Sequence, residues 1–152
     1  MGWGHMSTSV QRRAVMREIV RAAQETGDVV APWTAVDDVE THFADDEEVL
    51  LEVHREWVRV LVARLHRGEI VAERTAVDVR DLYDEVAASH PTLRRILDTH
   101  DTHPVLWEPT AQEHALLARI AGLAPAGTLP ERASTIGRTL VSQRIPRQRV
   151  TV

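Results

Sequence analysis

The chain has 152 residues, a formal net charge of −5 and no cysteine. This length suffices for one domain with its own hydrophobic core, and the lack of cysteine excludes disulfides, thiolate metal sites and a cysteine nucleophile. Lysine is absent too, because arginine supplies all 18 positive side chains, so Schiff-base chemistry is excluded. No apolar run approaches the roughly 18 residues of a spanning helix, so we expect a cytoplasmic protein with no membrane partner.

Three segments are expected along the chain. Residues 1–5 resemble an expression-tag remnant, residues 6–143 form one helical bundle domain, and residues 144–152 form a basic C-terminal tail. Beyond Ile145 the tail alternates polar with β-branched residues. Such a segment is either disordered or adds as an extended strip to another surface.

The segment 48–68 predicts the central helix of the fold. Asp45 and Glu48 suit its N-terminus as capping residues, and Gly68 suits its end. Apolar residues and one histidine recur at helical spacing and share one broad face, namely Leu50, Val53, His54, Trp57, Val58, Val60, Leu61 and Leu65. A face of this width requires at least two other helices to shield it from water.

The remaining chain also shows helical periodicity, and capping patterns open several of its segments. Helices are expected over residues 7–25, 34–43, 75–90, 91–100, 110–123 and 128–141, with loops over 28–34, where Trp33 should contact the core, and 101–109. The expected capping pairs are Thr8 with Gln11, Thr34 with Asp37, Thr75 with Asp78, Thr110 with Glu113 and Thr128 with Glu131. The sequence therefore predicts an all-α fold, a single compact bundle of about six helices.

His54 is the first candidate for a functional role, because it replaces a leucine on the apolar face of the central helix. A buried imidazole without a hydrogen-bond partner costs about 1–3 kcal/mol, so a polar group should face it. Two interpretations stay open. His54 is either a core histidine bonded to a carbonyl or hydroxyl, or a ligand-binding or proton-carrying residue in a central cavity.

A metal site is a weaker hypothesis, with His54, His100 and His103 as its tentative ligands. His90 and His114 also lie on or near inward faces, and the acids that could join them are Asp98, Asp101, Glu108 and Glu113. The spacing matches neither the Glu-x-x-His pairs of ferritin-like bundles nor a His-Glu-x-x-His zinc motif. Histidines at helix ends that interact with the helix dipole are the alternative, and no cofactor is expected.

Arg64 is a tentative ligand-binding residue, because helical spacing places it within about 40° of the centre of the apolar face of the central helix. A buried ion pair with a carboxylate of the next helix, such as Asp78, Asp81 or Asp84, is the structural interpretation, and anion binding is the functional one. The sequence has no glycine-rich phosphate loop and no serine in a nucleophile elbow. Nothing in the pattern supports an enzyme.

Charge is unevenly distributed along the chain. Residues 36–56 contain nine acids and one arginine, whereas residues 131–152 contain five arginines and one acid. Patches of opposite charge favour association between copies or with a charged protein. The same two charged segments are equally compatible with faces that only contact solvent. The tentative interaction residues are Arg138, Arg144, Arg147 and Arg149.

Three hypotheses about function follow. The leading one is a non-enzymatic helical interaction module that self-associates or binds a charged protein partner, with its C-terminal tail docked on another chain. The second is a bundle that binds a metal or small ligand at an inward histidine cluster centred on His54. The third and weakest is nucleic-acid binding through the arginine-rich C-terminal region, which the net negative charge and the few aromatic residues disfavour.

Overall fold

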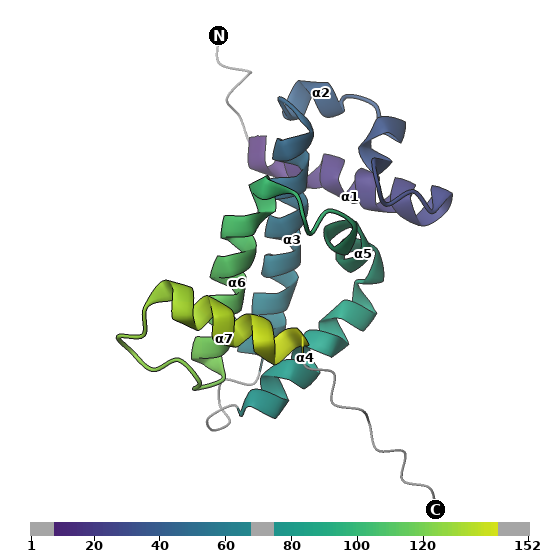
Figure 1. Cartoon of the computed structure of the whole chain (residues 1–152). Helices are drawn as coiled ribbons and strands as arrows, with labels where there is room; N and C mark the ends of the chain where they lie inside the picture. Colours follow the sequence, from purple (N-terminus) through teal and green to yellow (C-terminus); the bar gives the residue numbers. More distant parts are fainter. Residues whose placement is uncertain (1–7, 68–74, 143–152) are drawn as a thin grey trace, which may run out of the picture.

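The computed structural model describes residues 8–67 and 75–142 of the chain, and these ranges form seven α-helices and two short 3-10 turns (Figure 1). No strand occurs within them. The predicted all-α fold is therefore confirmed. The expression-tag remnant, Gly68 and the C-terminal tail with Arg144, Arg147 and Arg149 lie outside the described residues.

Helix α3, Asp46–His66, runs through the middle of the molecule and confirms the predicted central helix (Figure 1). Asp45 caps it, because its carboxylate accepts a hydrogen bond from the backbone N–H of Glu48 at 2.9 Å. Glu48 reaches back and accepts from the N–H of Ala44. Helices α1, α4, α5 and α6 all contact α3, so more than two helices lie against it, as expected.

The N-terminal part consists of α1, Thr8–Thr26, the turn η2, Pro32–Ala35, and the single helical turn α2, Val39–His42. Trp33 in η2 is buried as expected. The prediction of a helix over 34–43 capped by Thr34 and Asp37 is wrong. Thr34 lies inside the 3-10 turn and donates to the carbonyl of Ala31, and Asp38 adopts a left-handed conformation with φ of 64°, which interrupts a right-handed helix.

Helices α4, Ala76–Ser89, and α5, Pro91–Thr99, follow the predicted pattern. Thr75 and Asp78 form the expected reciprocal capping box at the start of α4. His90 ends α4 and precedes the first residue of α5. The helical conformation breaks between α4 and α5 at His90, because a residue before proline is pushed out of the helical region. Proline itself is tolerated in the first turn of the next helix.

The C-terminal part contains the turn η3, Pro104–Leu106, and helices α6, Trp107–Ile120, and α7, Pro130–Ser142. The start of α6 was predicted at Thr110, which is three residues too late, because Pro109 is accommodated in the first helical turn. Glu113 consequently lies well inside α6 and does not cap it. Thr128 likewise lies ahead of α7, which begins with Pro130.

Helices α6 and α7 cross at very short range (Figure 1). Gly137 of α7 lies against the backbone of His114, and a Cβ atom at position 137 would stand only 1.7 Å from the His114 carbonyl oxygen. Only glycine allows two backbones to approach so closely. This contact fixes α7 against α6 and thereby supports the segment of α6 that carries Glu113.

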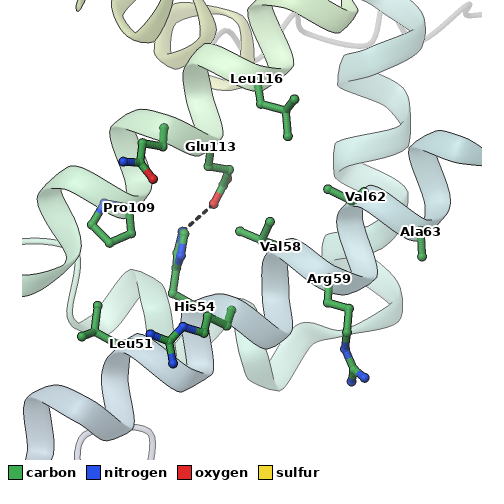
Figure 2. Close-up of a pocket in the computed structure, with 11 residues that line it drawn as sticks. Leu51, His54, Val58, Arg59, Val62, Ala63, Pro109, Glu113 and Leu116 are labelled. Carbon is green, nitrogen blue, oxygen red and sulfur yellow. Dashed lines mark hydrogen bonds and ion pairs between the residues drawn. The ribbon is translucent and has the colours of Figure 1, made fainter. Parts of the chain in front are cut away.

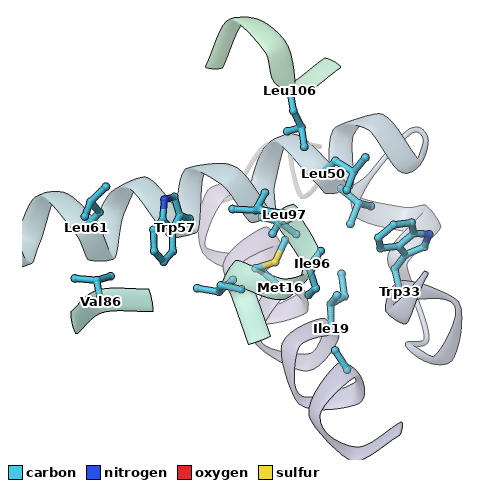
Figure 3. Close-up of a cluster of buried hydrophobic side chains, with 14 of the residues drawn as sticks. Met16, Ile19, Trp33, Leu50, Trp57, Leu61, Val86, Ile96, Leu97 and Leu106 are labelled. Carbon is cyan, nitrogen blue, oxygen red and sulfur yellow. The ribbon is translucent and has the colours of Figure 1, made fainter. Parts of the chain in front are cut away.

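One large hydrophobic core lies around α3 and unites side chains of α1, α4, α5 and α6 (Figure 3). Trp57 is fully buried in it, as expected, and Met16, Ile19 and Ile96 are almost equally buried. In the described ranges, no helix has the length and apolar character needed to cross a membrane.

Candidate ligand site between helices α3 and α6

His54 lies on the inner face of α3, one turn before Trp57, and only 6% of its surface is exposed. The helical spacing that buries Leu50, Val53 and Trp57 also carries His54 inward. The expectation that a polar group faces this imidazole is correct. The group is a carboxylate, not the carbonyl or hydroxyl that the structural interpretation assumed.

That carboxylate belongs to Glu113 of α6, which is 4% exposed. The distance between His54 Nε2 and Glu113 Oε1 is 2.9 Å (Figure 2). An ionised carboxylate can only accept hydrogen bonds, so His54 Nε2 is the donor of this bond when Glu113 is charged. A buried charge is tolerated only when it is paired, and here each side chain is the other's partner.

Each member of the pair retains one polar atom. Among the described residues, the bond between Nε2 and Oε1 is the only hydrogen bond that either side chain makes. His54 Nδ1 and Glu113 Oε2 therefore have no protein partner there. Both residues line the same pocket (Figure 2), so these atoms are the polar groups that the pair offers to a bound molecule.

The pocket is an open slot of about 860 Å³ between α3 and α6. The two helices contact each other and lie side by side in Figure 1. Most of the lining is apolar, and the residues are Leu51, His54, Arg55, Val58, Arg59, Val62, Ala63, Pro109, Gln112, Glu113 and Leu116. None of these described residues carries a hydroxyl or thiol, so the part of the lining that they form offers no serine-, threonine- or cysteine-type nucleophile.

Arg55 and Arg59 lie at the edge of the slot, one helical turn apart on α3. Arg55 Nη1 donates to Glu52 at 2.9 Å, and Arg59 Nη2 forms an ion pair with Glu56. Both arginine side chains are substantially exposed. Exposed ion pairs within one helix contribute little to stability, so these guanidinium groups are free to turn toward a ligand.

A second group of polar side chains is partly buried where α3, α4 and α5 meet. Arg94 of α5 stacks over Trp57 with 4.7 Å between its guanidinium carbon and the ring centre, and it donates to the Tyr83 hydroxyl at 3.0 Å. Burial raises the pKa of Tyr83 far above its usual value, with Arg94 opposing this shift and Glu113 adding to it. Tyr83 therefore stays neutral. The charge of Glu113 contributes to this raised pKa, so Glu113 influences the polar group around Tyr83.

His114 follows Glu113 on α6 and is half-buried. Burial lowers the pKa of His114, and the Glu113 charge opposes this shift while Arg138 adds to it. A lowered pKa means that folding favours the neutral imidazole. The residue beside the pair thus makes the stability of α6 sensitive to acid.

The other histidines predicted as tentative metal ligands do not join His54. His100 ends α5, where its Nε2 bonds to the carbonyl of Val30 at 2.7 Å and its ring lies against Trp33. His103 Nδ1 accepts from the N–H of Val105 at the start of η3. In the described part of the chain, no cluster of three or more His, Asp or Glu residues has the geometry to hold a metal ion.

Arg64 does pair with a carboxylate of α4, but the details of the prediction are wrong. The partner is Glu85, with 2.8 Å between Arg64 Nη2 and Glu85 Oε1, and not Asp78, Asp81 or Asp84. The pair is not buried, since 36% of the Arg64 side chain and 54% of the Glu85 side chain are exposed. Arg64 lies toward the edge of the apolar face, where its guanidinium reaches solvent.

Sequence reasoning named Glu113 among the acids near the tentative histidine cluster but did not pair it with His54. The pattern of threonine followed three residues later by glutamate indicated a capping pair, and that reading placed Glu113 in the first turn of a helix. If the helix is taken from Trp107, helical spacing puts Glu113 on the same face as Pro109, Leu116 and Leu117. An acid on an apolar face of α6 and a histidine on an apolar face of α3 were the available signal.

No protein-family model matches this chain, and the searches of curated proteins and of solved structures found no match either. The fold and the site alone define its class. It is an all-α protein with a buried histidine and glutamate pair in the wall of a largely apolar pocket.

Proposed function

We propose that this protein is a non-enzymatic binding protein that holds a small, mostly apolar molecule in the slot between α3 and α6. One observation carries the proposal. His54 and Glu113 are almost fully buried, bonded to each other at 2.9 Å, and still line a pocket of about 860 Å³. Ligand pockets typically combine such apolar walls with a few fixed polar groups.

The lining favours a ligand with an apolar body and one hydrogen-bonding group. Val58, Val62 and Leu116 offer aliphatic contacts on both sides of the slot (Figure 2). Glu113 Oε2 can accept a hydrogen bond from a ligand hydroxyl or amide, and His54 Nδ1 can exchange one with a neighbouring ligand oxygen or nitrogen. Because the pair is already bonded internally, its geometry is preorganised before the ligand enters.

Filling the slot tests this proposal. A library of small apolar molecules is screened by ligand-observed NMR, and the hits are measured against the native chain, Val58→Trp and Leu116→Trp. We expect either large side chain to occupy the slot and to weaken binding at least about tenfold, which corresponds to about 1.4 kcal/mol. Two variants are used so that a folding defect in one does not decide the result.

Val77→Trp is the matched control, because Val77 is 57% exposed on α4 and lies outside the pocket lining. Circular dichroism checks that all three variants fold. If the library gives no hit for the native chain, or if the hits bind both pocket variants as tightly as the control, the proposed function is wrong.

Self-association through opposite charges is a second candidate, supported by where the charged residues lie. Asp37, Asp38 and Glu40 are exposed near α2 at one end of the molecule, and Arg132 and Arg138 are exposed on α7 toward the other (Figure 1). Opposite charges at two ends favour head-to-tail encounters between copies. Arg12 of α1 weakens this polarity, because it pairs with Glu48 at 3.7 Å.

Sedimentation velocity tests the second candidate. We expect the full chain to associate at low salt and to dissociate as salt rises, because screening weakens contacts between exposed charges. A truncation after Gln143 and the double variant Arg132→Gln with Arg138→Gln should both reduce association. A monomer at every salt concentration would rule this candidate out.

A further inference from the structure

Two cationic side chains lie at the edge of the α3–α6 slot, and each is paired with an acid of the same helix. Among the lining residues that the structure describes, Arg55 and Arg59 are cationic and Glu113 is the single acid. Glu113 is already bonded to His54 inside the slot, so it does not neutralise the arginines at the edge. Glu52 and Glu56, which do pair with them, are not among the lining residues.

Both arginines have donors to spare. A guanidinium group has five N–H donors in a planar fork. Within the described residues, Arg55 uses only Nη1 for Glu52 and Arg59 uses only Nη2 for Glu56. Each can therefore keep its intrahelical partner while its other nitrogens bind an oxyanion, and bidentate contacts to carboxylate or phosphate are the geometry that arginine favours.

The mostly apolar lining beside these arginines extends along both helices. The lining residues of α3 extend from Leu51 to Ala63, which is about 18 Å along a helix axis at 1.5 Å per residue. On the α6 side, Pro109 and Leu116 lie seven residues apart, a span of about 10 Å. Such a lining fits an extended or folded hydrocarbon chain better than a compact polar metabolite.

From charge and shape together we infer that the ligand is an anionic amphiphile, whose carboxylate or phosphate head lies at Arg55 and Arg59 and whose hydrocarbon body lies along Val58, Val62 and Leu116. This inference rests on the proposed function and specifies its ligand class. The pair formed by His54 and Glu113 then meets the body of the ligand. It favours a ligand with a hydroxyl or amide there in addition to its charged head.

Four probes with the same ten-carbon chain separate the head groups, namely decanoate, decyl phosphate, decanol and decyltrimethylammonium. Binding is measured by calorimetry below the micellar concentration of each probe. We expect decanoate or decyl phosphate to bind about fivefold or more tightly than decanol, and the cationic probe to bind weakest. The ratio between the two anions distinguishes a carboxylate source from a phosphate source.

The arginine contribution is tested by Arg55→Gln combined with Arg59→Gln. This variant should bind decanoate and decanol equally, and the preference of the native chain for the anions should shrink as salt rises. Arg95→Gln combined with Arg132→Gln is the matched control, because both arginines are exposed and neither lines the slot. The control should keep the native preference for the anions.

Two results would overturn the inference and leave the binding function intact. One is that decanoate and decanol bind with equal affinity and that Val58→Trp still abolishes the binding of both. The other is failure of all four probes to bind while hits from the apolar library still bind and remain sensitive to Val58→Trp and Leu116→Trp. If neither Val58→Trp nor Leu116→Trp weakens the binding of any ligand, the proposed function itself is contradicted.

Discussion

The pair formed by His54 and Glu113 lowers stability through burial of polar groups, and it provides polar atoms to the pocket. Each side chain takes a polar group out of water, and the single bond between them offsets part of that cost. Hydrophobic residues of similar size at both positions would pack with the surrounding aliphatic side chains at little loss, or even a gain, of stability. A polar pair at this place is therefore better explained by what it offers to the pocket than by what it contributes to folding.

The pair can be tested by a double-mutant cycle. Glu113→Leu leaves His54 Nε2 without its partner, so we expect the free energy of unfolding to fall by about 1–3 kcal/mol, and His54→Leu should cost a similar amount. The double variant should lose less than the sum of the two, because no polar group is then left unpaired. Urea unfolding followed by circular dichroism measures all four proteins, and strictly additive losses would contradict the account of the pair.

His114 makes a prediction about acid. Its pKa is lowered in the folded chain by burial, whereas an unfolded chain protonates it near about pH 6.5. The unfolded state then binds the proton more readily, so the stabilising contribution is complete above that pH and falls as the pH drops through it. We expect His114→Gln to reduce the loss of unfolding free energy between about pH 7.5 and pH 5.

The control for this prediction is His90→Gln, since His90 is exposed and its side chain makes no capping bond. This variant should keep the acid sensitivity of the native chain. If His114→Gln retains that sensitivity in full, the acid dependence arises elsewhere in the molecule.

At the scale of elements, the sequence predicts most helices because periodicity and caps agree locally. Asp45 at α3, Thr75 with Asp78 at α4, and Pro91 at α5 mark boundaries through chemistry that acts within a few residues. The errors occur where a neighbouring proline changes the local rule. Pro109 is compatible with a helix that begins earlier, and Pro32 favours a turn before the expected helix at Thr34.

The site is less predictable than the helices, because it depends on which faces meet. His54 is identifiable from its place on an apolar face, but its partner lies 59 residues away on α6. Helical periodicity gives the orientation of each face and says nothing about the neighbour that will cover it. Arg64 shows the same limit, since the sequence indicates α4 as its partner helix but not Glu85 as its partner residue.

Gly137 tests the placement of α7 on α6. Gly137→Ala would bring a methyl group to within 1.7 Å of the His114 carbonyl oxygen, so the helices must separate. We expect the free energy of unfolding to fall by about 3 kcal/mol or more, the upper range for overpacking. Thr139→Ala on the exposed side of α7 should change it by less than about 0.5 kcal/mol. A Gly137→Ala protein as stable as this control would mean that the two helices do not approach as described.

At the scale of the whole molecule, the core and the site adjoin each other along the same helix. The side of α3 that carries Trp57 and Leu61 is enclosed by the core, while the side that carries Val58 and Val62 lines an open slot with α6. The two valines are half-buried, so part of each side chain is open to the slot, while Val58 also packs against the core. A rigid helix fixed on its core side can present the open side with little rearrangement, which favours tight binding.

The most direct test of the central claim is an NMR spectrum of the full chain with labelled leucine and valine methyl groups, recorded with decanoate and with the strongest hits from the apolar library. The account predicts Overhauser contacts from bound ligand to the methyl groups of Val58, Val62 and Leu116, which line the slot. Contacts confined to Val77, Leu123 or Leu129, which are exposed elsewhere on the molecule, would contradict it.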